Sequence, residues 1–141
     1  MPLPTISPQR EVPLTLRILV VDAHTAFRQA LAYVLEQEPD ITGVAQGSGL
    51  AAARDMLEDV DVATIELQLA DGSGCDLVRS LCVTNPHGAV LILTSSRDRR
   101  DYAQAMLAGA AGVMHKSVGI TEIISAVRRL GQGQALLAPT S

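Results

Sequence analysis

The segment 62–67 constrains the fold most, because it is a short apolar run that ends in a single carboxylate, Glu66. A stretch of turn-forming residues, Asp71-Gly72-Ser73-Gly74, follows shortly after it. Apolar runs of this length between turn residues are typical of strands buried on both faces of a parallel sheet. Open α/β folds place their ligand-binding groups beyond the carboxyl ends of such strands. The sequence therefore predicts that Glu66 lies at the mouth of a parallel sheet.

Four more segments have the composition of strands, and helical patterns separate them. The predicted strands cover residues 16–21, 41–45, 62–67, 89–94 and 112–115. The predicted helices begin at His24 or Thr25 and, further on, cover about 50–57, 75–83, 99–107 and 120–130. The last helix carries its apolar side chains on one face, at Ile120, Ile123, Ile124, Val127 and Leu130. The units repeat at roughly the 20–27 residues of a βα unit, which indicates an α/β fold.

Right-handed crossovers turn five such units into a doubly wound parallel sheet with helices on both faces. The common strand order for this arrangement is 2-1-3-4-5. In that order, the ends of four strands surround one crevice. The side chains that they bring to it are those of Asp22, Glu66, Thr94-Ser95 and Lys116.

Composition and charge exclude several other classes of protein. The 141 residues carry a formal net charge of −4, which gives no reason to expect nucleic-acid binding by this chain itself. No apolar run approaches the roughly 18 residues of a membrane helix. Cys75 and Cys82 lie on one predicted helix, too far apart for a disulfide, and free thiols are typical of a reducing cytosol. The sequence thus predicts a cytoplasmic protein that does not contact membranes.

The chain divides into three predicted parts. Residues 1–15 hold four prolines among polar neighbours and are predicted to form a disordered leader. Residues 16–133 form the α/β domain. Residues 134–141 include Leu136-Leu137-Ala138-Pro139 and are predicted to begin a linker to a C-terminal domain that is not present in this chain.

Taken together, these segments resemble a known family, the receiver domain of two-component response regulators, and most closely its NarL/LuxR-type branch. The resemblance covers about residues 17–139 and implies the flavodoxin-like, CheY-like (βα)5 fold. It rests on residues 18–24, 61–67 and 90–95, and on Gly109-Ala110-Ala111-Gly112 leading to Lys116.

The resemblance implies a phosphoryl-transfer site with an aspartate acceptor after the third strand and a bound Mg²⁺ ion. Asp22 matches the first of two acidic metal ligands. Thr94 and Lys116 match the hydroxyl and the amine that contact phosphoryl oxygens. No residue outside this constellation shows a catalytic motif, so we expect no enzyme activity.

Three positions depart from the family pattern. Glu66 stands at the phosphoacceptor position, Ala23 replaces the second acidic metal ligand, and Val113 replaces the aromatic residue at the switch position. A carboxylate that is one methylene longer is displaced, and misplacement by about 1 Å can cost on the order of 100-fold in rate. The loss of a carboxylate at position 23 weakens a site for a hard cation. We therefore expect weak or absent Mg²⁺ binding and no efficient phosphorylation.

These departures lead to the hypothesis of an atypical, phosphorylation-independent receiver, in which a Glu66–Lys116 pair, or a contact of Glu66 with Thr94, fixes the state of the site. An equally open alternative is that Glu66 only ends a strand and meets solvent. The expected role is control of homodimerisation and of DNA binding by the absent C-terminal helix-turn-helix domain. Other possibilities are a receiver phosphorylated on Glu66 by a sensor kinase, a module that senses a small molecule or a protein, and a small α/β enzyme.

Overall fold

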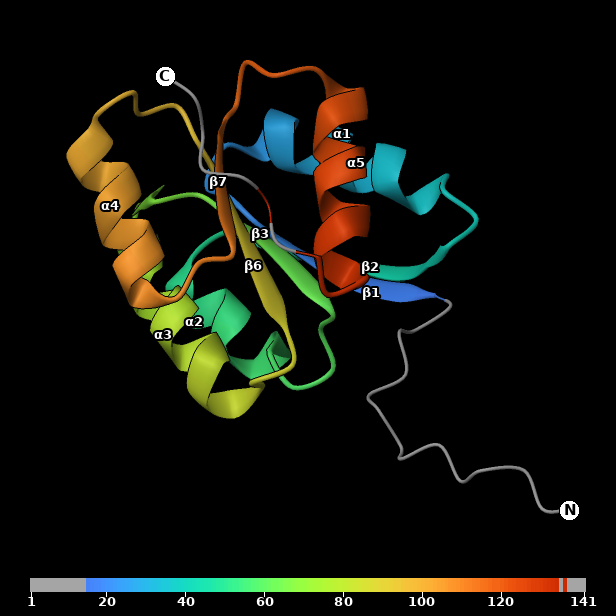
Figure 1. Cartoon of the computed structure of the whole chain (residues 1–141), viewed down its shortest axis with the longest axis horizontal. Coiled ribbons are helices and arrows are strands. Elements are labelled where there is room, and N and C mark those ends of the chain that lie inside the picture. The colour runs from blue at the N-terminus through green and yellow to red at the C-terminus, as the bar shows by residue number, and fades with distance from the viewer. Residues whose placement is uncertain (1–14, 135, 137–141) are drawn as a thin grey trace, which may run out of the picture.

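A parallel sheet lies between two layers of helices in the computed structural model, which describes residues 15–134 and 136 (Figure 1). The five sheet strands are β1 (Leu16–Val21), β2 (Ile41–Gly47), β3 (Val62–Ile65), β6 (Ala89–Thr94) and β7 (Gly112–His115). The helices are α1 (Thr25–Glu36), α2 (Leu50–Ala53), the 3₁₀ helix η1 (Arg54–Met56), α3 (Gly74–Thr84), α4 (Arg99–Ala108) and α5 (Ile120–Gly131).

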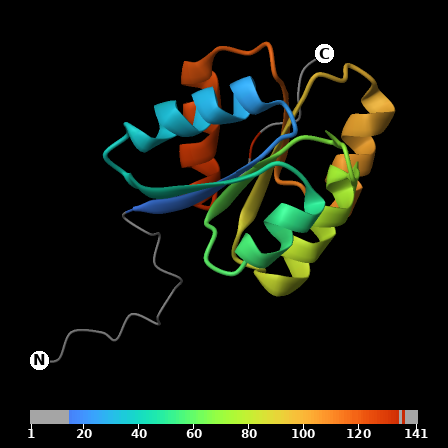
Figure 2. The same cartoon turned by 180° about the vertical axis from the view of Figure 1, so that it is seen from behind.

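The sheet has the order β2-β1-β3-β6-β7, and all of its strands are parallel. Numbered by their place among these five strands, they follow the predicted order 2-1-3-4-5, so the predicted doubly wound (βα)5 fold is confirmed. Helices α1 and α5 cover one face, and α2, α3 and α4 cover the other (Figures 1 and 2). The central strand β3 is buried along its whole length, as the apolar run predicts.

The last predicted helix is α5, and its apolar face is buried except at the first residue. Ile123, Ile124, Val127 and Leu130 are buried against the sheet, but Ile120 is 41% exposed. Ile120 begins α5 and precedes the turn of the helix that packs on the sheet. The apolar face of this helix therefore reaches solvent at Ile120 and is buried from Ile123 onward.

The helix predicted over residues 50–57 is α-helical only to Ala53 and continues as the 3₁₀ helix η1. The tighter 3₁₀ geometry ends the helix early, and Leu57 then enters the core. The carboxylate of Asp71 caps the start of α2, because it accepts hydrogen bonds from the backbone N–H groups of Leu50 and Ala51 at 2.9 and 3.1 Å. These two N–H groups hold the pKa of Asp71 below its usual value.

The turn predicted at residues 71–74 is part of a small antiparallel hairpin of β4 (Gln68–Leu69) and β5 (Gly72–Ser73), which the sequence did not predict. Gly72 has a φ of 148°, a conformation that favours glycine. The predicted leader lies outside the described residues apart from Thr15, as does most of the predicted linker. In the part of the chain that is described, no helix is long and apolar enough to cross a membrane.

Candidate functional site

The sheet itself positions the residues at the carboxyl ends of its strands. The backbone N–H of Glu66 donates to the carbonyl of Val21 at 3.0 Å, and that of Lys116 donates to the carbonyl of Thr94 at 2.9 Å. These bonds extend the pairing of neighbouring strands by one residue. The Cα atoms of Glu66 and Lys116 are therefore fixed by the sheet rather than by loops.

Lys116 lies between two buried carboxylates. Its Nζ is 2.6 Å from Oδ2 of Asp22 and 3.5 Å from Oε1 of Glu66. The side chains of Lys116, Asp22 and Glu66 are only 15%, 4% and 6% exposed. The structure thus brings three of the predicted site residues into one cluster with two negative charges and one positive charge, and the amine approaches Asp22 more closely than Glu66.

Backbone N–H groups hold both carboxylates in place. Oε2 of Glu66 accepts a hydrogen bond from the N–H of Leu67 at 2.8 Å, and Oε1 has a long contact of 3.5 Å with the hydroxyl of Ser95. Oδ1 of Asp22 accepts from the N–H of His24 at 2.8 Å. Each carboxylate therefore has one oxygen on the backbone and one oxygen toward Lys116.

An aromatic ring also contacts Lys116. Its Nζ lies 4.8 Å from the centre of the ring of Phe27, a distance typical of a cation–π contact. Phe27 lies in the first turn of α1, so this helix contributes directly to the site. The sequence did not indicate this contact, because helical periodicity does not show whether an aromatic ring meets a charge.

Thr94 is fully buried at the end of β6, and its Oγ1 accepts a hydrogen bond from the N–H of Ser96 at 3.1 Å. Its hydroxyl oxygen therefore stabilises the turn after the strand. The residue that reaches toward Glu66 from this segment is Ser95, which the sequence places at the crevice but to which the family pattern gives no role. The sequence does not show whether the hydroxyl of Thr94 or that of Ser95 faces Glu66, because this depends on the direction of each side chain at the strand end.

The two remaining predicted positions lie on either side of the cluster. Ala23 is exposed at the turn before α1, and Val113 is 3% exposed in β7. His115 lies beyond Val113, with Nε2 at 3.0 Å from the carbonyl oxygen of Ser95 and Nδ1 at 2.6 Å from the hydroxyl of Ser117. His115 thereby connects the loops that follow β6 and β7.

The residues of this site do not fit the Mg²⁺ ion that the family pattern implies. Only Asp22 and Glu66 offer carboxylate oxygens, because Ala23 has no donor, and Lys116 occupies the space beside Asp22. Mg²⁺ requires oxygen ligands in near-octahedral geometry. Nowhere in residues 15–134 and 136 do three His, Cys, Asp or Glu side chains gather closely enough to hold a metal ion.

A second charged cluster, which the sequence did not reveal, lies at the amino end of the sheet. The guanidinium of Arg128 in α5 bonds both carboxylate oxygens of Asp40 at 2.7 and 3.0 Å and lies 3.1 Å from Glu38. The bonds from Arg128 hold the pKa of Asp40 below its usual value, and the two acids raise the pKa of Arg128. The residues are 88 positions apart in sequence, so no local pattern indicates the pair.

Comparison with known proteins identifies the class. Residues 18–128 match the family described as "Response regulator receiver domain". The chain belongs to this family, and the predicted resemblance to receiver domains is confirmed.

Two regulators show the relationship in sequence. The chain is 35% identical over 123 residues to the DNA-binding transcriptional activator DevR/DosR of Mycobacterium tuberculosis, covering 86% of this chain and 57% of that protein. It is 27% identical over 126 residues to the transcriptional regulatory protein DegU of Brevibacillus brevis, covering 88% and 53%. The chain therefore spans little more than half the length of these relatives.

The solved structures agree. The NarL signal receiver domain from Mycobacterium tuberculosis superposes with a TM-score of 0.80 at 25% identity, covering 86% of this chain and all of that one. A Burkholderia pseudomallei response regulator, solved with a phosphorylated aspartic acid and a calcium ion, has a TM-score of 0.74 at 25% identity, covering 84% and 69%.

Some relatives carry an enzyme domain as well. The chain is 32% identical over 114 residues to a protein-glutamate methylesterase/protein-glutamine glutaminase of Rhizobium johnstonii, but it covers only 31% of that protein. The matched family is the receiver domain, and the match says nothing of the remaining two thirds of the enzyme.

Proposed function

We propose that this chain is an atypical receiver domain that works without phosphorylation, with Glu66 at the position of the phosphoacceptor. The observation that carries the proposal is the position of Lys116, whose ammonium group lies between the buried carboxylates of Asp22 and Glu66. In this arrangement the amine offsets one of the two negative charges of the acidic pocket, and the family pattern gives the role of counter-ion to a metal ion. The site then holds one state that does not depend on a kinase.

Two physical arguments support weak phosphoryl transfer. The carboxylate of Glu66 accepts a hydrogen bond from the backbone N–H of Leu67 and forms an ion pair with Lys116. In-line attack by this carboxylate on a phosphoryl group would require both contacts to break. The transferring phosphoryl group would also lack the cation that neutralises its oxygens. The reason is that Ala23 supplies no carboxylate ligand for a metal ion at this site. We infer weak or absent Mg²⁺ binding for the same reason.

The role in the whole protein is inferred from the relatives. DevR/DosR and DegU are transcriptional regulators, and the former is named a DNA-binding activator. We propose that residues 16–133 regulate the dimerisation and DNA binding of a helix-turn-helix domain joined through residues 134–141, in the cytoplasm and without enzyme activity. The input would be a sensor kinase, a ligand or a protein partner that recognises the fixed state.

Intact-mass measurement after incubation with a small phosphodonor and Mg²⁺ tests the proposal. The expected result is an unchanged mass for the wild-type chain. The control is the Burkholderia pseudomallei regulator, for which a phosphorylated aspartate is on record. A gain of one phosphoryl group in this chain that disappears in Glu66→Gln would overturn the proposal and favour a receiver that is phosphorylated on glutamate.

A further inference from the structure

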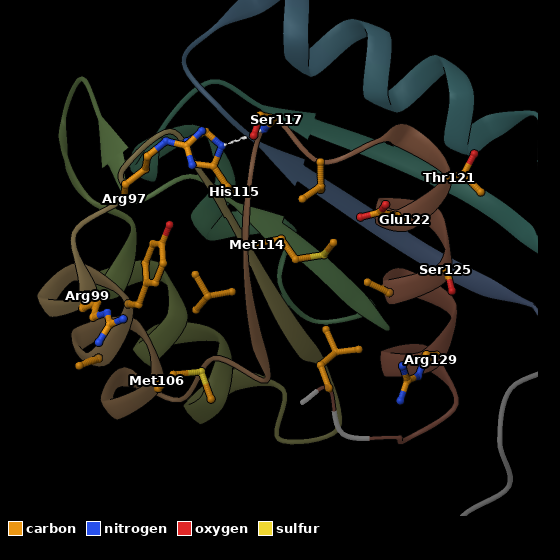
Figure 3. Close-up of a pocket in the computed structure, with 16 residues that line it drawn as sticks. Arg97, Arg99, Met106, Met114, His115, Ser117, Thr121, Glu122, Ser125 and Arg129 are labelled. Atoms are coloured by element: carbon orange, nitrogen blue, oxygen red, sulfur yellow. Dashed lines mark hydrogen bonds between the residues drawn. The ribbon is translucent and has the colours of Figure 1, made fainter. Parts of the chain in front are cut away.

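A groove of about 1370 Å³ runs between α4 and α5, with β7 as its floor. Figure 3 shows Arg99 and Met106 of α4 along one side, and Glu122 and Arg129 of α5 along the other. We call this feature the α4–β7–α5 groove. It lies at the sheet edge formed by β7, and none of Asp22, Glu66 and Lys116 lines it, although His115 and Ser117 on either side of Lys116 do.

The chain reverses its direction directly after α5. Gly133 has a φ of 76°, its N–H donates to the carbonyl of Leu130 at 3.0 Å, and the N–H of Gln134 donates to the carbonyl of Arg129 at 2.9 Å. This pair of bonds around a left-handed glycine is the Schellman motif, which caps the last carbonyls of a helix. The motif therefore sets the direction in which the following residues leave α5.

Leu136 lies on the floor of this groove, against Gly112. A Cβ atom added to Gly112 would lie 2.5 Å from Cδ1 and 3.3 Å from Cγ of Leu136. Leu136 is half-buried and packs with Met114 and Val118 against the apolar core that α5 covers. Gly112 does not have a positive φ, so its backbone does not require glycine. A side chain at position 112 would therefore force the side chain of Leu136 to move.

We propose that the α4–β7–α5 groove is the docking site of the chain's own segment after α5, with Leu136 as the anchor. A second copy of the chain, or another protein, reaches the Gly112 end of the groove only by displacing Leu136. This inference concerns a different surface from the Glu66 site, so it does not depend on whether Glu66 accepts a phosphoryl group.

The short connection favours the chain's own segment over a second copy as the occupant. Leu136 follows the Schellman turn at Gly133 by three residues. A tether of this length corresponds to a local concentration in the millimolar range or above, roughly, which a separate molecule at micromolar concentration does not match. Direct contact between Leu136 and Gly112 therefore forms without a partner.

Methyl NMR on the chain labelled with ¹³C at leucine and methionine methyl groups tests the contact. We expect nuclear Overhauser effects between the Leu136 methyl groups and the Hα protons of Gly112 in the wild-type chain. Gly112→Ala is expected to abolish the Leu136 contacts with residue 112 and shift the Leu136 methyl signals. Gly43→Ala is the matched control, because a Cβ atom there meets nothing within 4 Å, and it is expected to leave these signals unchanged.

A second variant keeps the test decisive if Gly112→Ala does not fold. Leu136→Ala is expected to shift the methyl signal of Met114 while leaving that of Met56, on the other side of the sheet, in place. Absence of the Leu136–Gly112 effect in the wild-type chain would overturn the proposal. So would an effect seen only between labelled and unlabelled molecules in a mixed sample, since the occupant would then be a second copy.

Discussion

The two ends of the sheet carry clusters with the same charges and different surroundings. Each cluster has one cation and two carboxylates. At the carboxyl end, the members Lys116, Asp22 and Glu66 are 15%, 4% and 6% exposed. At the amino end, the members Arg128, Asp40 and Glu38 are 35%, 32% and 27% exposed.

The difference in burial decides what each cluster does. The partly exposed cluster joins Arg128, near the end of α5, to the loop before β2 through ion pairs, and water screens the charges of these pairs. The cluster of Lys116 is enclosed, so each charge relies on the others because water cannot replace a missing partner. The arrangement of the buried cluster can therefore be fixed or changed by one charged group, such as the ammonium of Lys116.

Removal of the buried cation is expected to have the largest effect. Lys116→Met leaves Asp22 and Glu66 as neighbouring buried carboxylates without a counter-ion, and we expect a loss of about 3 kcal/mol in the free energy of unfolding. Urea denaturation at neutral pH measures it. Lys116→Met combined with Glu66→Gln should recover part of the loss, because one of the two charges is gone. A loss below about 1 kcal/mol for the single variant would mean that the pair is not buried as described.

Restoring the family's acids is expected to convert the buried cluster into a metal site. In Ala23→Asp/Glu66→Asp, a second carboxylate stands beside Asp22 and the acceptor has the shorter side chain. We expect phosphorylation by a small phosphodonor and Mg²⁺ to rise by about 100-fold over the wild-type chain. Intact mass over time measures the rate, and Glu66→Asp alone is the matched control. Equal rates in the wild-type chain and the double variant would contradict the account.

The exposed cluster is expected to tolerate loss of its cation. For Arg128→Met we expect a loss of about 1 kcal/mol, because the bidentate bond to Asp40 is well formed but partly screened by water. The loss should shrink in high salt, while that of Lys116→Met should not. Urea denaturation at low and high salt checks both. A loss at Arg128 equal to that at Lys116 would remove the distinction between the two ends.

The smallest expected effect is on the pH dependence of stability. The lowered pKa of Asp40 means that its contribution is fully present above the unfolded pKa near 3.8 and is lost as the pH falls through the lower folded value. Asp40→Asn should therefore be less stable than the wild-type chain at neutral pH. The difference should vanish once the pH is below the folded pKa. Thermal unfolding between neutral and strongly acidic pH measures it, and a constant difference throughout would contradict this origin.

The sequence predicts the strands and their convergence because these follow from periodicity and from the geometry of parallel sheets. Glu66 and Lys116 were placed at the same edge on those grounds alone. Which carboxylate lies closer to Lys116 was not predictable from the sequence. The distances from its Nζ to Asp22 and to Glu66 differ by less than 1 Å. Contacts that join distant segments, such as Arg128 with Asp40 and Leu136 with Gly112, leave no periodic pattern in the sequence.

A crystal structure of the chain soaked with Mg²⁺ and beryllofluoride tests the central claim most directly. The account predicts that Nζ of Lys116 keeps its ion pairs with Asp22 and Glu66, with no metal between them. An octahedral Mg²⁺ ion bound by Asp22 and Glu66, with Lys116 turned toward a beryllofluoride on Glu66, would contradict it.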